Sequence, residues 1–269
     1  MSTLNLNFKQ FINIPYRIVT RITGTDLRVF VKNIIGLAPY IRDWINYNRQ
    51  VALANPFRAK LSGFLSHYTL ADRYENAGVA KGEYFHQDLW FARKIFADNP
   101  EQHWDIGSRI DGFIAHLLVF RSVKVIDIRS INSQVSGLCF QQGDITSLSL
   151  ADNSIKSISC LHTIEHIGLG RYGDPIDPLG HLKGIKELQR ILAPGGKLYF
   201  SAPIGKERVE FNAHRIFDPS TIIDKFSDLN LIDFAAINKQ GDLVEPAKWQ
   251  DFRDVDYACG LFVFEKCVN

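Results

Sequence analysis

The chain has 269 residues, of which 46% are hydrophobic and 22% are charged, and its formal net charge is +2. This length and composition are typical of a globular protein with one large domain and an appendage. No run approaches the roughly 18 uninterrupted apolar residues of a membrane span, and the four cysteines lack the C-x-x-C spacing of a zinc site. Because the N-terminus shows no charged segment followed by an apolar core, we expect a cytoplasmic protein.

The charge is unevenly distributed along the chain. Residues 1–60 carry nine basic and two acidic side chains, a net charge of +7, which leaves −5 for the remainder. We predict a basic helical N-terminal extension or cap over residues 1–80 and a main domain over residues 81–269. The extension is expected to be broken into short helices by four residues: Pro15, Gly24, Gly36 and Pro39.

Two interpretations of the extension remain open. In one, it is a helical cap on the main domain with solvated basic side chains. In the other, residues 1–60 form a peripheral surface that contacts anionic lipid or cradles an anionic or lipid-linked substrate. Nucleic acid is disfavoured as a partner because no recognised binding module is present.

The first element of the main domain is a helix that opens at Gly82 and continues to about Ala97. Apolar residues recur there at helical spacing, and Asn99-Pro100 ends the helix. Alternating segments follow. Strands are predicted at 103–107, 123–127, 138–141, 155–161 and 197–202, and helices at 110–120 and 179–192.

The C-terminal third continues this alternation and then changes it. Ala193-Pro-Gly-Gly196 is a helix-stop and turn signal. A helix is predicted over 219–227, with Asp218 as its cap and a proline at its first position. The strands at 231–237 and 260–265 have no helix between them, so they must run antiparallel, as a hairpin-like ending on the sheet edge.

The stretch from Gln102 to Asn153 organises the chain. It reads as a strand, a tight turn, a helix and a second strand that ends in Asp127, which is the order of a nucleotide-type pocket. One carboxylate can accept hydrogen bonds from both hydroxyls of a ribose diol. The sequence therefore predicts a cofactor site here.

Six segments together resemble the class I S-adenosylmethionine-dependent methyltransferases, over roughly residues 83–265. They are Asp105-Ile-Gly-Ser, Val125-Ile-Asp127, Gly143-Asp-Ile145, Leu150-Ala-Asp-Asn-Ser154, Leu161-His-Thr-Ile-Glu-His166 and Glu187 to Leu198. The resemblance implies an α/β fold, Rossmann-like and doubly wound, with a mostly parallel seven-stranded sheet and an antiparallel last strand. The N-terminal helical extension is added to it.

A shorter resemblance is narrower. Gly82 to Asp88 and His166 to Pro175 resemble a family of uncharacterised methyltransferase-like proteins, some encoded among bacterial surface-polysaccharide genes. This similarity favours polysaccharide biosynthesis and an acceptor that is a small molecule or a nucleotide-linked or lipid-linked sugar.

The wider resemblance implies S-adenosylmethionine as cofactor. The first-strand turn would border its methionine half through Asp105, Gly107 and Ser108. Asp127 would hold the ribose. The adenine would contact Asp144 and the Ile145 backbone N–H. Leu161 would line the mouth of the pocket where the methyl group is donated, and Gln87 would lie above it, near the start of the helix.

Transfer to an oxygen acceptor also requires a base. The candidates are His166 and His162 just after the fourth strand, with His214 as a weaker one. Tyr172 and Asp174 belong to a long loop expected to shape the acceptor site. The planar guanidinium of Arg215 suits a phosphate or carboxylate of the acceptor.

One departure from the family pattern leaves other functions open. The first turn reads Gly107-Ser-Arg-Ile-Asp-Gly112, so Arg109 replaces a glycine of the usual G-x-G. A non-catalytic binding or scaffold protein of this fold therefore stays an alternative, as does a nicotinamide-dependent enzyme, although G-x-G-x-x-G is absent. His162-x-x-Glu-His166 matches an inverted zinc-peptidase pattern, but it ends an apolar strand rather than lying on a helix. No metal site is predicted.

Overall fold

The structure is a computed structural model of the chain. It describes residues 20, 24, 26–53, 55–60, 62, 69–70, 72–74, 76–132 and 134–268. The chain divides between Val79 and Ala80 into two compact units. Among the described residues, no helix is long and apolar enough to cross a membrane.

In its described residues, the N-terminal unit has the long helix α2 (Leu27–Gln50) and a short 3-10 turn, η1 (Asp72–Tyr74). The predicted breaks at Gly36 and Pro39 are wrong, because α2 runs through both. Gly36 packs against the backbone of Leu70, where a side chain would collide, so the glycine serves close packing. The predicted break at Pro15 lies outside the described residues.

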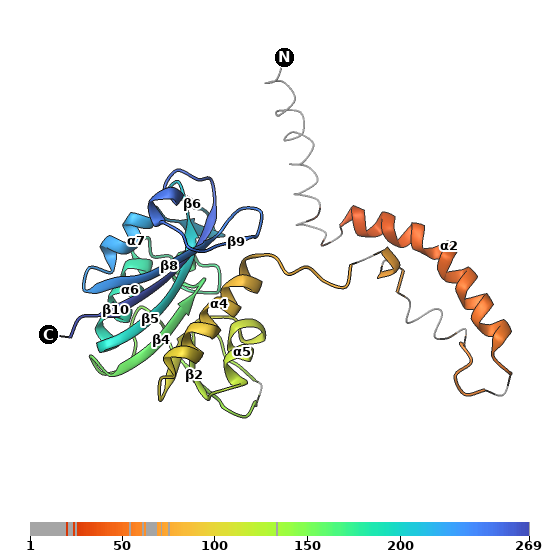
Figure 1. The fold of residues 1–269 in the computed structure, drawn as a ribbon, viewed down its shortest axis with the longest axis horizontal. Helices are drawn as coiled ribbons and strands as arrows, with labels where there is room; N and C mark the ends of the chain where they lie inside the picture. The colour runs from red at the N-terminus through yellow and green to blue at the C-terminus, as the bar shows by residue number, and fades with distance from the viewer. Residues whose placement is uncertain are drawn as a thin grey trace, which may run out of the picture. The chain divides into compact units, whose positions relative to one another are not determined.

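The main unit is built on an eight-stranded sheet with the order β3-β2-β1-β4-β5-β10-β8-β9 (Figure 1). Its strands are β1 (His103–Ile106), β2 (Val123–Asp127), β3 (Leu138–Gln142), β4 (Ile155–Leu161), β5 (Leu192–Ile204), β8 (Leu229–Ile237), β9 (Leu243–Val244) and β10 (Ala258–Lys266). β1 to β5 run parallel, and β10 is antiparallel to both of its neighbours. This is the predicted α/β fold with one short strand more, β9.

The predicted antiparallel pair forms, as β8 and β10, toward one end of the sheet. The strand order was not predicted: β10 lies between β5 and β8, and the short β9 forms that edge. Seven consecutive residues of β10, from Ala258 to Phe264, are buried. A strand that is apolar on both faces is stable only where both of its neighbours and both of its faces are covered.

Different helices cover the two faces of the sheet (Figure 1). α4 (Glu83–Asp98), the π-helical turn η2 (Ile110–Ile114) and α5 (Ala115–Leu118) cover one face; α6 (Gly180–Ile191) and α7 (Pro219–Lys225) cover the other. Apart from β5, the predicted helices and strands of this unit end within two residues of the observed ones.

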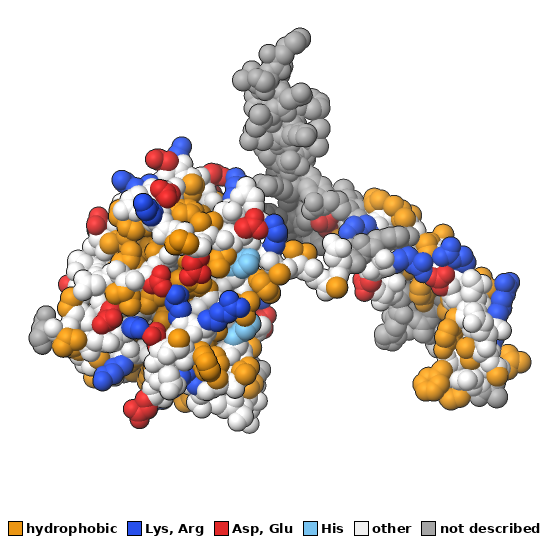
Figure 2. Space-filling view, in the orientation of Figure 1, with side chains coloured by type: hydrophobic (Ala, Val, Ile, Leu, Met, Phe, Trp, Pro, Cys, Tyr) orange, Lys and Arg blue, Asp and Glu red, His pale blue; other side chains and the backbone are white. Residues whose placement is uncertain are grey.

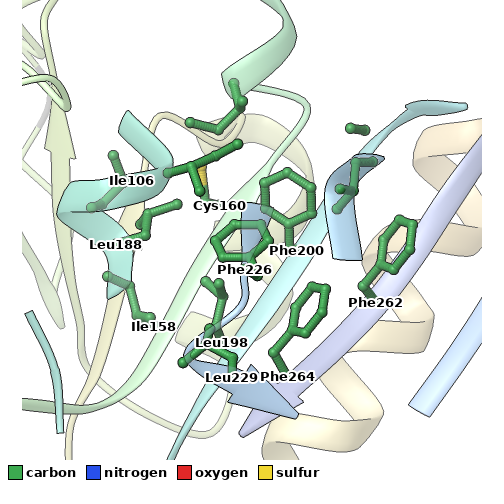
Figure 3. Close-up of a cluster of buried hydrophobic side chains, with 14 of the residues drawn as sticks. Ile106, Ile158, Cys160, Leu188, Leu198, Phe200, Phe226, Leu229, Phe262 and Phe264 are labelled. Atoms are coloured by element: carbon green, nitrogen blue, oxygen red, sulfur yellow. The ribbon is translucent and has the colours of Figure 1, made fainter. Parts of the chain in front are cut away.

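β10 shows how the two layers share one sheet. Cys259 and Leu261 pack with α4 and α5, whereas Phe262 and Phe264 pack with α6 and α7, because successive side chains of a strand point to opposite faces. Figure 3 shows the second layer, in which Phe264 and Phe226 lie with ring centroids 4.9 Å apart.

The turn predicted at residues 193–196 lies within the first residues of β5. Ile155 pairs with Leu192 and Ser157 with Lys197, so the Ala-Pro-Gly-Gly sequence forms an irregularity at the beginning of the strand. A small hairpin of β6 (Arg208–Glu210) and β7 (His214–Ile216) follows β5. The 3-10 turns η3 (Ile164–His166) and η4 (Trp249–Phe252) complete the unit.

Candidate functional site

A pocket opens where the parallel strands β1, β2 and β4 end. In an open α/β sheet this carboxyl edge is the usual place for a ligand. Seven of the eight predicted cofactor residues line it: Gln87, Gly107, Ser108, Asp127, Asp144, Ile145 and Leu161. The fold therefore brings together residues from the loops after β1 and β3, from the ends of β2 and β4, and from helix α4. Cofactor binding by them stays a prediction.

Asp105 is the eighth predicted residue, and it supports the pocket from behind. It is fully buried, and its carboxylate accepts hydrogen bonds from the Ser108 N–H at 3.0 Å, the Ser108 hydroxyl at 2.6 Å and the Ser159 hydroxyl at 2.5 Å. Burial raises the pKa of Asp105 to about 6. Its hydrogen bonds with Ser108 hold the first turn in place, and its side chain does not line the pocket.

The first turn explains why Arg109 is tolerated. Gly107 has a φ of +75°, and a Cβ there would lie 2.6 Å from Thr163 Cγ2, so this position requires glycine. Arg109 has a φ of −69° in extended backbone, which any residue adopts. The substitution therefore introduces a charged side chain without straining the turn.

Asp127 is the residue predicted to hold a ribose, and it is already paired. Its carboxylate accepts from the Arg129 backbone N–H at 2.8 Å, Nε at 2.9 Å and Nη2 at 2.7 Å. The Arg129 guanidinium also lies over the Tyr172 ring at 4.5 Å. Arg129 lines the pocket and was missed from the sequence; its position two residues after a strand-end acid was the available signal.

Asp144 shapes the turn after β3. Its Oδ1 atom accepts from the Thr146 N–H and the Thr146 hydroxyl, both at 2.8 Å, as aspartates in such turns commonly do. The neighbouring Ile145 is buried and contributes an apolar wall.

His162 belongs to a buried polar network. Its Nδ1 lies 2.8 Å from Glu165 Oε1, and its Nε2 lies 3.2 Å from Cys259 Sγ. Burial favours the neutral ring, but Cys259 and Glu165 outweigh burial and raise the pKa of His162 well above its ordinary value. We therefore expect an imidazolium at neutral pH, which cannot accept a proton.

Gln87 connects this network to helix α4. Its Oε1 accepts from the Ser201 hydroxyl at 2.6 Å, and its amide nitrogen donates to Asp88 Oδ1 at 3.0 Å. Both polar ends of this buried side chain are used, and the bond with Ser201 on β5 links α4 to the sheet.

His166 has the opposite protonation behaviour. Its Nδ1 lies 2.7 Å from the Ala213 carbonyl oxygen; because a carbonyl only accepts, Nδ1 carries the hydrogen and Nε2 can accept a proton. Nε2 lies 3.5 Å from Glu165 Oε1. Burial is the main reason that the pKa of His166 lies below its usual 6.5; Glu165 opposes this and Arg171 reinforces it. A neutral imidazole therefore lines the pocket at pH 7.

The loop between η3 and α6 forms the outer wall of the pocket. Asp174 accepts from the backbone N–H groups of Gly168 at 2.7 Å and Tyr172 at 3.2 Å, so it organises the loop. The Tyr172 ring faces His166 edge-on, with 5.6 Å between ring centroids. Both predicted loop residues line the pocket.

Besides Asp105, two predicted residues are not part of the pocket lining. Arg215 is buried and donates to three backbone carbonyls, those of Ile167 at 2.7 Å and of Glu165 and Pro178 at 3.4 Å. This guanidinium holds the loop in place, so it is not available to bind an acceptor phosphate. His214 lies on β7 near Glu210, at 3.5 Å.

In the described part of the chain, no group of three or more His, Cys, Asp and Glu side chains is arranged to hold a metal ion. His162 and Glu165 are hydrogen-bonded to each other, which is a structural pairing.

The sequence comparisons give a partial family match. A family model described as "Caenorhabditis protein of unknown function, DUF268" matches residues 145–244, which is less than half of the chain. No curated protein matches the sequence.

Solved structures resemble the chain more broadly. The 4+2 cyclase SpnF has a TM-score of 0.51 at 13% identity, over 87% of this chain and 94% of that one. A methyltransferase candidate from Bacillus halodurans C-125 has a TM-score of 0.50 at 14% identity, over 67% and 99%. The N-methyltransferase NodS from Bradyrhizobium japonicum WM9, solved with S-adenosyl-L-homocysteine, has a TM-score of 0.49 at 14% identity, over 83% and 97%.

The two structures with TM-scores of 0.50 and 0.51 show the fold of the main unit. It is an α/β fold like that of the Bacillus halodurans structure, with a mostly parallel central sheet and an antiparallel strand inserted next to β5. Sequence identities of 13–14% show a shared fold and do not show a shared reaction.

Proposed function

We propose that this chain is an S-adenosylmethionine-dependent methyltransferase that methylates an oxygen atom of a sugar or glycan precursor. One observation carries the proposal. On a methyltransferase fold, the turn after β1, the acid after β2 and the acid after β3 converge on one pocket. These are the positions that the family resemblance assigns to the methionine, ribose and adenine of the cofactor.

The residues present fit such a cofactor. Asp127 is an acceptor of hydrogen bonds at the end of β2, as a ribose diol requires. Ile126, Ile128 and Ile145 supply apolar walls on which a planar base can rest. When bound, S-adenosylmethionine would supply an activated methyl group on a sulfonium, so placing the acceptor would account for much of the rate.

The two histidines of the pocket receive different roles. His166 is the base that takes the proton of the acceptor hydroxyl, because its lowered pKa keeps it neutral and the Ala213 carbonyl fixes its ring. His162 stays protonated, and it orients η3 through Glu165. A neutral base next to the pocket supports an oxygen acceptor, whose hydroxyl must lose a proton during transfer.

The assignment of a sugar acceptor has less support than the assignment of the cofactor. Its support is the resemblance of Gly82 to Asp88 and His166 to Pro175 to proteins encoded among surface-polysaccharide genes. The fold by itself does not fix the chemistry, since SpnF is named as a cyclase. A binding protein without catalysis therefore remains the second candidate.

Calorimetric titration tests the cofactor. S-adenosylmethionine and S-adenosylhomocysteine are titrated into the wild type, Asp127→Asn and the control Asp152→Asn, whose exposed carboxylate pairs with Arg190 outside the pocket. We expect micromolar binding that weakens at least tenfold, about 1.4 kcal/mol, in Asp127→Asn only. A well-folded wild type that binds neither ligand would exclude the proposed cofactor.

We also propose that the N-terminal unit contacts an anionic membrane surface peripherally. Five apolar side chains recur along α2 at spacings of three and four residues and are exposed: Phe30, Ile34, Leu37, Ile41 and Ile45. Such spacing puts them on one helix face. Basic side chains accompany them along the helix (Figure 2), and the net charge of +7 in residues 1–60 favours anionic lipid.

A further inference from the structure

Two arginines of the pocket share one arrangement. Arg109 lies three residues after the end of β1, and Arg129 lies two residues after the end of the adjacent β2. Each donates through Nε and Nη2 to a carboxylate two positions away. For Arg109 and Asp111 the distances are 3.1 and 2.8 Å, and for Arg129 and Asp127 they are 2.9 and 2.7 Å.

Each guanidinium also rests on a tyrosine. Arg109 lies 4.9 Å from the Tyr84 ring centre, and Arg129 lies 4.5 Å from that of Tyr172. Tyr84 and Tyr172 line the same pocket. A guanidinium stacked on a ring keeps its plane fixed while its N–H groups stay available at the edge.

Both arginine side chains are accessible to a competing anion, since Arg109 is 55% exposed and Arg129 is 52% exposed. The pair of Arg109 with Asp111 is exposed on both sides and contributes little. Asp127 is only 10% exposed, so its pair with Arg129 opens when another donor takes the place of the guanidinium. The forks use Nε and Nη2, so Nη1 of each arginine takes no part in them. A multiply charged anion can therefore compete for both guanidinium groups.

Asp127 cannot serve Arg129 and a ribose diol together. A carboxylate offers about four acceptor positions, and Arg129 occupies three of those of Asp127. A diol needs two. At least one bond from Arg129 must therefore break when the diol binds, and a side-chain bond is the easier one to give up because the arginine side chain can rotate away.

We propose that ribose binding at Asp127 releases Arg129, and that Arg129 and Arg109 then hold a phosphate or diphosphate group of the acceptor at the pocket mouth. This inference rests on the proposed function and names its substrate class: a sugar carried on phosphate. Two guanidinium groups match the charge of a phosphate or diphosphate better than that of a single carboxylate.

The other carboxylates of the pocket lining have partners of their own. Asp144 is held by Thr146, Asp174 by backbone N–H groups of its loop, and Asp177 by Lys183 at 2.7 Å. Asp88 accepts from the Gln87 amide. These interactions moderate the negative charge that an anionic acceptor meets beside the two arginines.

The test is calorimetric titration of inorganic pyrophosphate at constant ionic strength, with and without saturating S-adenosylhomocysteine. Coupling between two sites is reciprocal and measurable as a ratio of affinities. In the wild type we expect pyrophosphate to bind about fivefold or more tightly when S-adenosylhomocysteine is present. Equal affinities in the two states would overturn the release of Arg129.

Variants separate the steps. Arg129→Gln is expected to weaken pyrophosphate binding and to bind S-adenosylhomocysteine more tightly than the wild type, because a competitor for Asp127 is gone. Asp127→Asn, without any cofactor, is expected to bind pyrophosphate as tightly as the wild type does with S-adenosylhomocysteine. Arg253→Gln, an exposed arginine that pairs with Asp218 outside the pocket, is the charge-matched control and should change neither affinity.

The outcomes also distinguish the two proposals. If S-adenosylhomocysteine does not bind, the proposed cofactor fails, while Asp127→Asn still reports whether a released Arg129 binds pyrophosphate. If it binds but Arg129→Gln and Arg109→Gln keep wild-type affinity for pyrophosphate, the phosphate site alone is overturned. Titrations of uridine diphosphate and geranyl diphosphate then distinguish a nucleotide-linked from a lipid-linked source, by which of them binds more tightly than pyrophosphate.

Discussion

His162 and His166 lie four residues apart, yet their surroundings shift their pKa values in opposite directions, so that His162 is cationic and His166 neutral at pH 7. His162 sits between a carboxylate and a sulfur in a closed network, and His166 is tied to a carbonyl. A sequence pattern contains neither distance. The sequence favoured His166 over His162 as the base, and the contacts of the two rings support the same order, which stays a prediction.

The charge difference predicts the pH dependence of methyl transfer. A base must be unprotonated, and the pKa of His166 lies below 6.5, so the rate should be constant above about pH 6.5 and fall in more acidic solution. His166→Gln should lose about 10²-fold or more of kcat, together with this acidic limb. Stopped assays from pH 5 to 8 measure it, once an acceptor has been found.

His116→Gln is the control for that prediction, since His116 is exposed and lies outside the pocket lining. NMR titration of the imidazole signals gives an independent reading without any acceptor. A ring of His166 that is still protonated at pH 7 would contradict the assignment of the base.

The raised pKa of Asp105 leads to a prediction about how stability depends on pH. Its pKa is 3.8 in the unfolded chain and about 6 when folded, so the folded state holds the proton more tightly. The stabilisation by protonation is complete below pH 3.8 and is lost as the pH rises through about 6. By linkage this amounts to about 3 kcal/mol.

Asp105→Asn removes this titration. Relative to the variant, the wild type should lose about 3 kcal/mol of unfolding free energy between pH 4 and pH 7, measured by urea unfolding at both values. The exposed Glu101→Gln is the control for loss of one carboxylate. A difference between wild type and Asp105→Asn that does not change with pH would refute the assignment.

Elements were more predictable than site contacts. Alternating apolar runs and turn residues located the helices and seven strands of the main unit, because local periodicity reports which faces are buried. The short strands β6, β7 and β9 were missed. The Asp218 cap also forms as expected, with its carboxylate accepting from the Ser220 N–H at 2.8 Å. Strand order is a long-range property, so the insertion of β10 between β5 and β8 was not contained in local patterns.

The interior position of β10 predicts the cost of a cavity there. Phe264 is fully buried against Phe226 and Phe262, so Phe264→Ala should destabilise the unit by about 3–5 kcal/mol. Phe211→Ala, at a phenylalanine that is 74% exposed, should cost under about 1 kcal/mol. Thermal or urea unfolding of both variants measures this, and equal losses would be inconsistent with a central β10.

At the scale of the whole molecule, the strongly basic part of the chain, residues 1–60, belongs to the N-terminal unit. The predicted boundary at residue 80 rested on composition, and the membrane contact rested on the same charge pattern. Arg129 shows the limit of this reasoning, since an arginine after a strand is unremarkable in sequence and acquires meaning only beside Asp127 and Tyr172.

The exposed face of α2 makes the last prediction. The full chain should float with vesicles of phosphatidylcholine and phosphatidylserine. It should be released as the salt concentration is raised, because salt screens the attraction of the basic side chains to anionic lipid, and the apolar side chains alone do not hold the chain on the vesicle. Phe30→Ser combined with Ile34→Ser should reduce flotation severalfold, since both side chains lie on one helix face. Val119→Ser with Ile232→Ser removes equally exposed apolar groups from the main unit and should leave flotation unchanged. If both pairs reduce flotation alike, attraction is not specific to α2; if neither does, the N-terminal unit must use this face for something other than lipid.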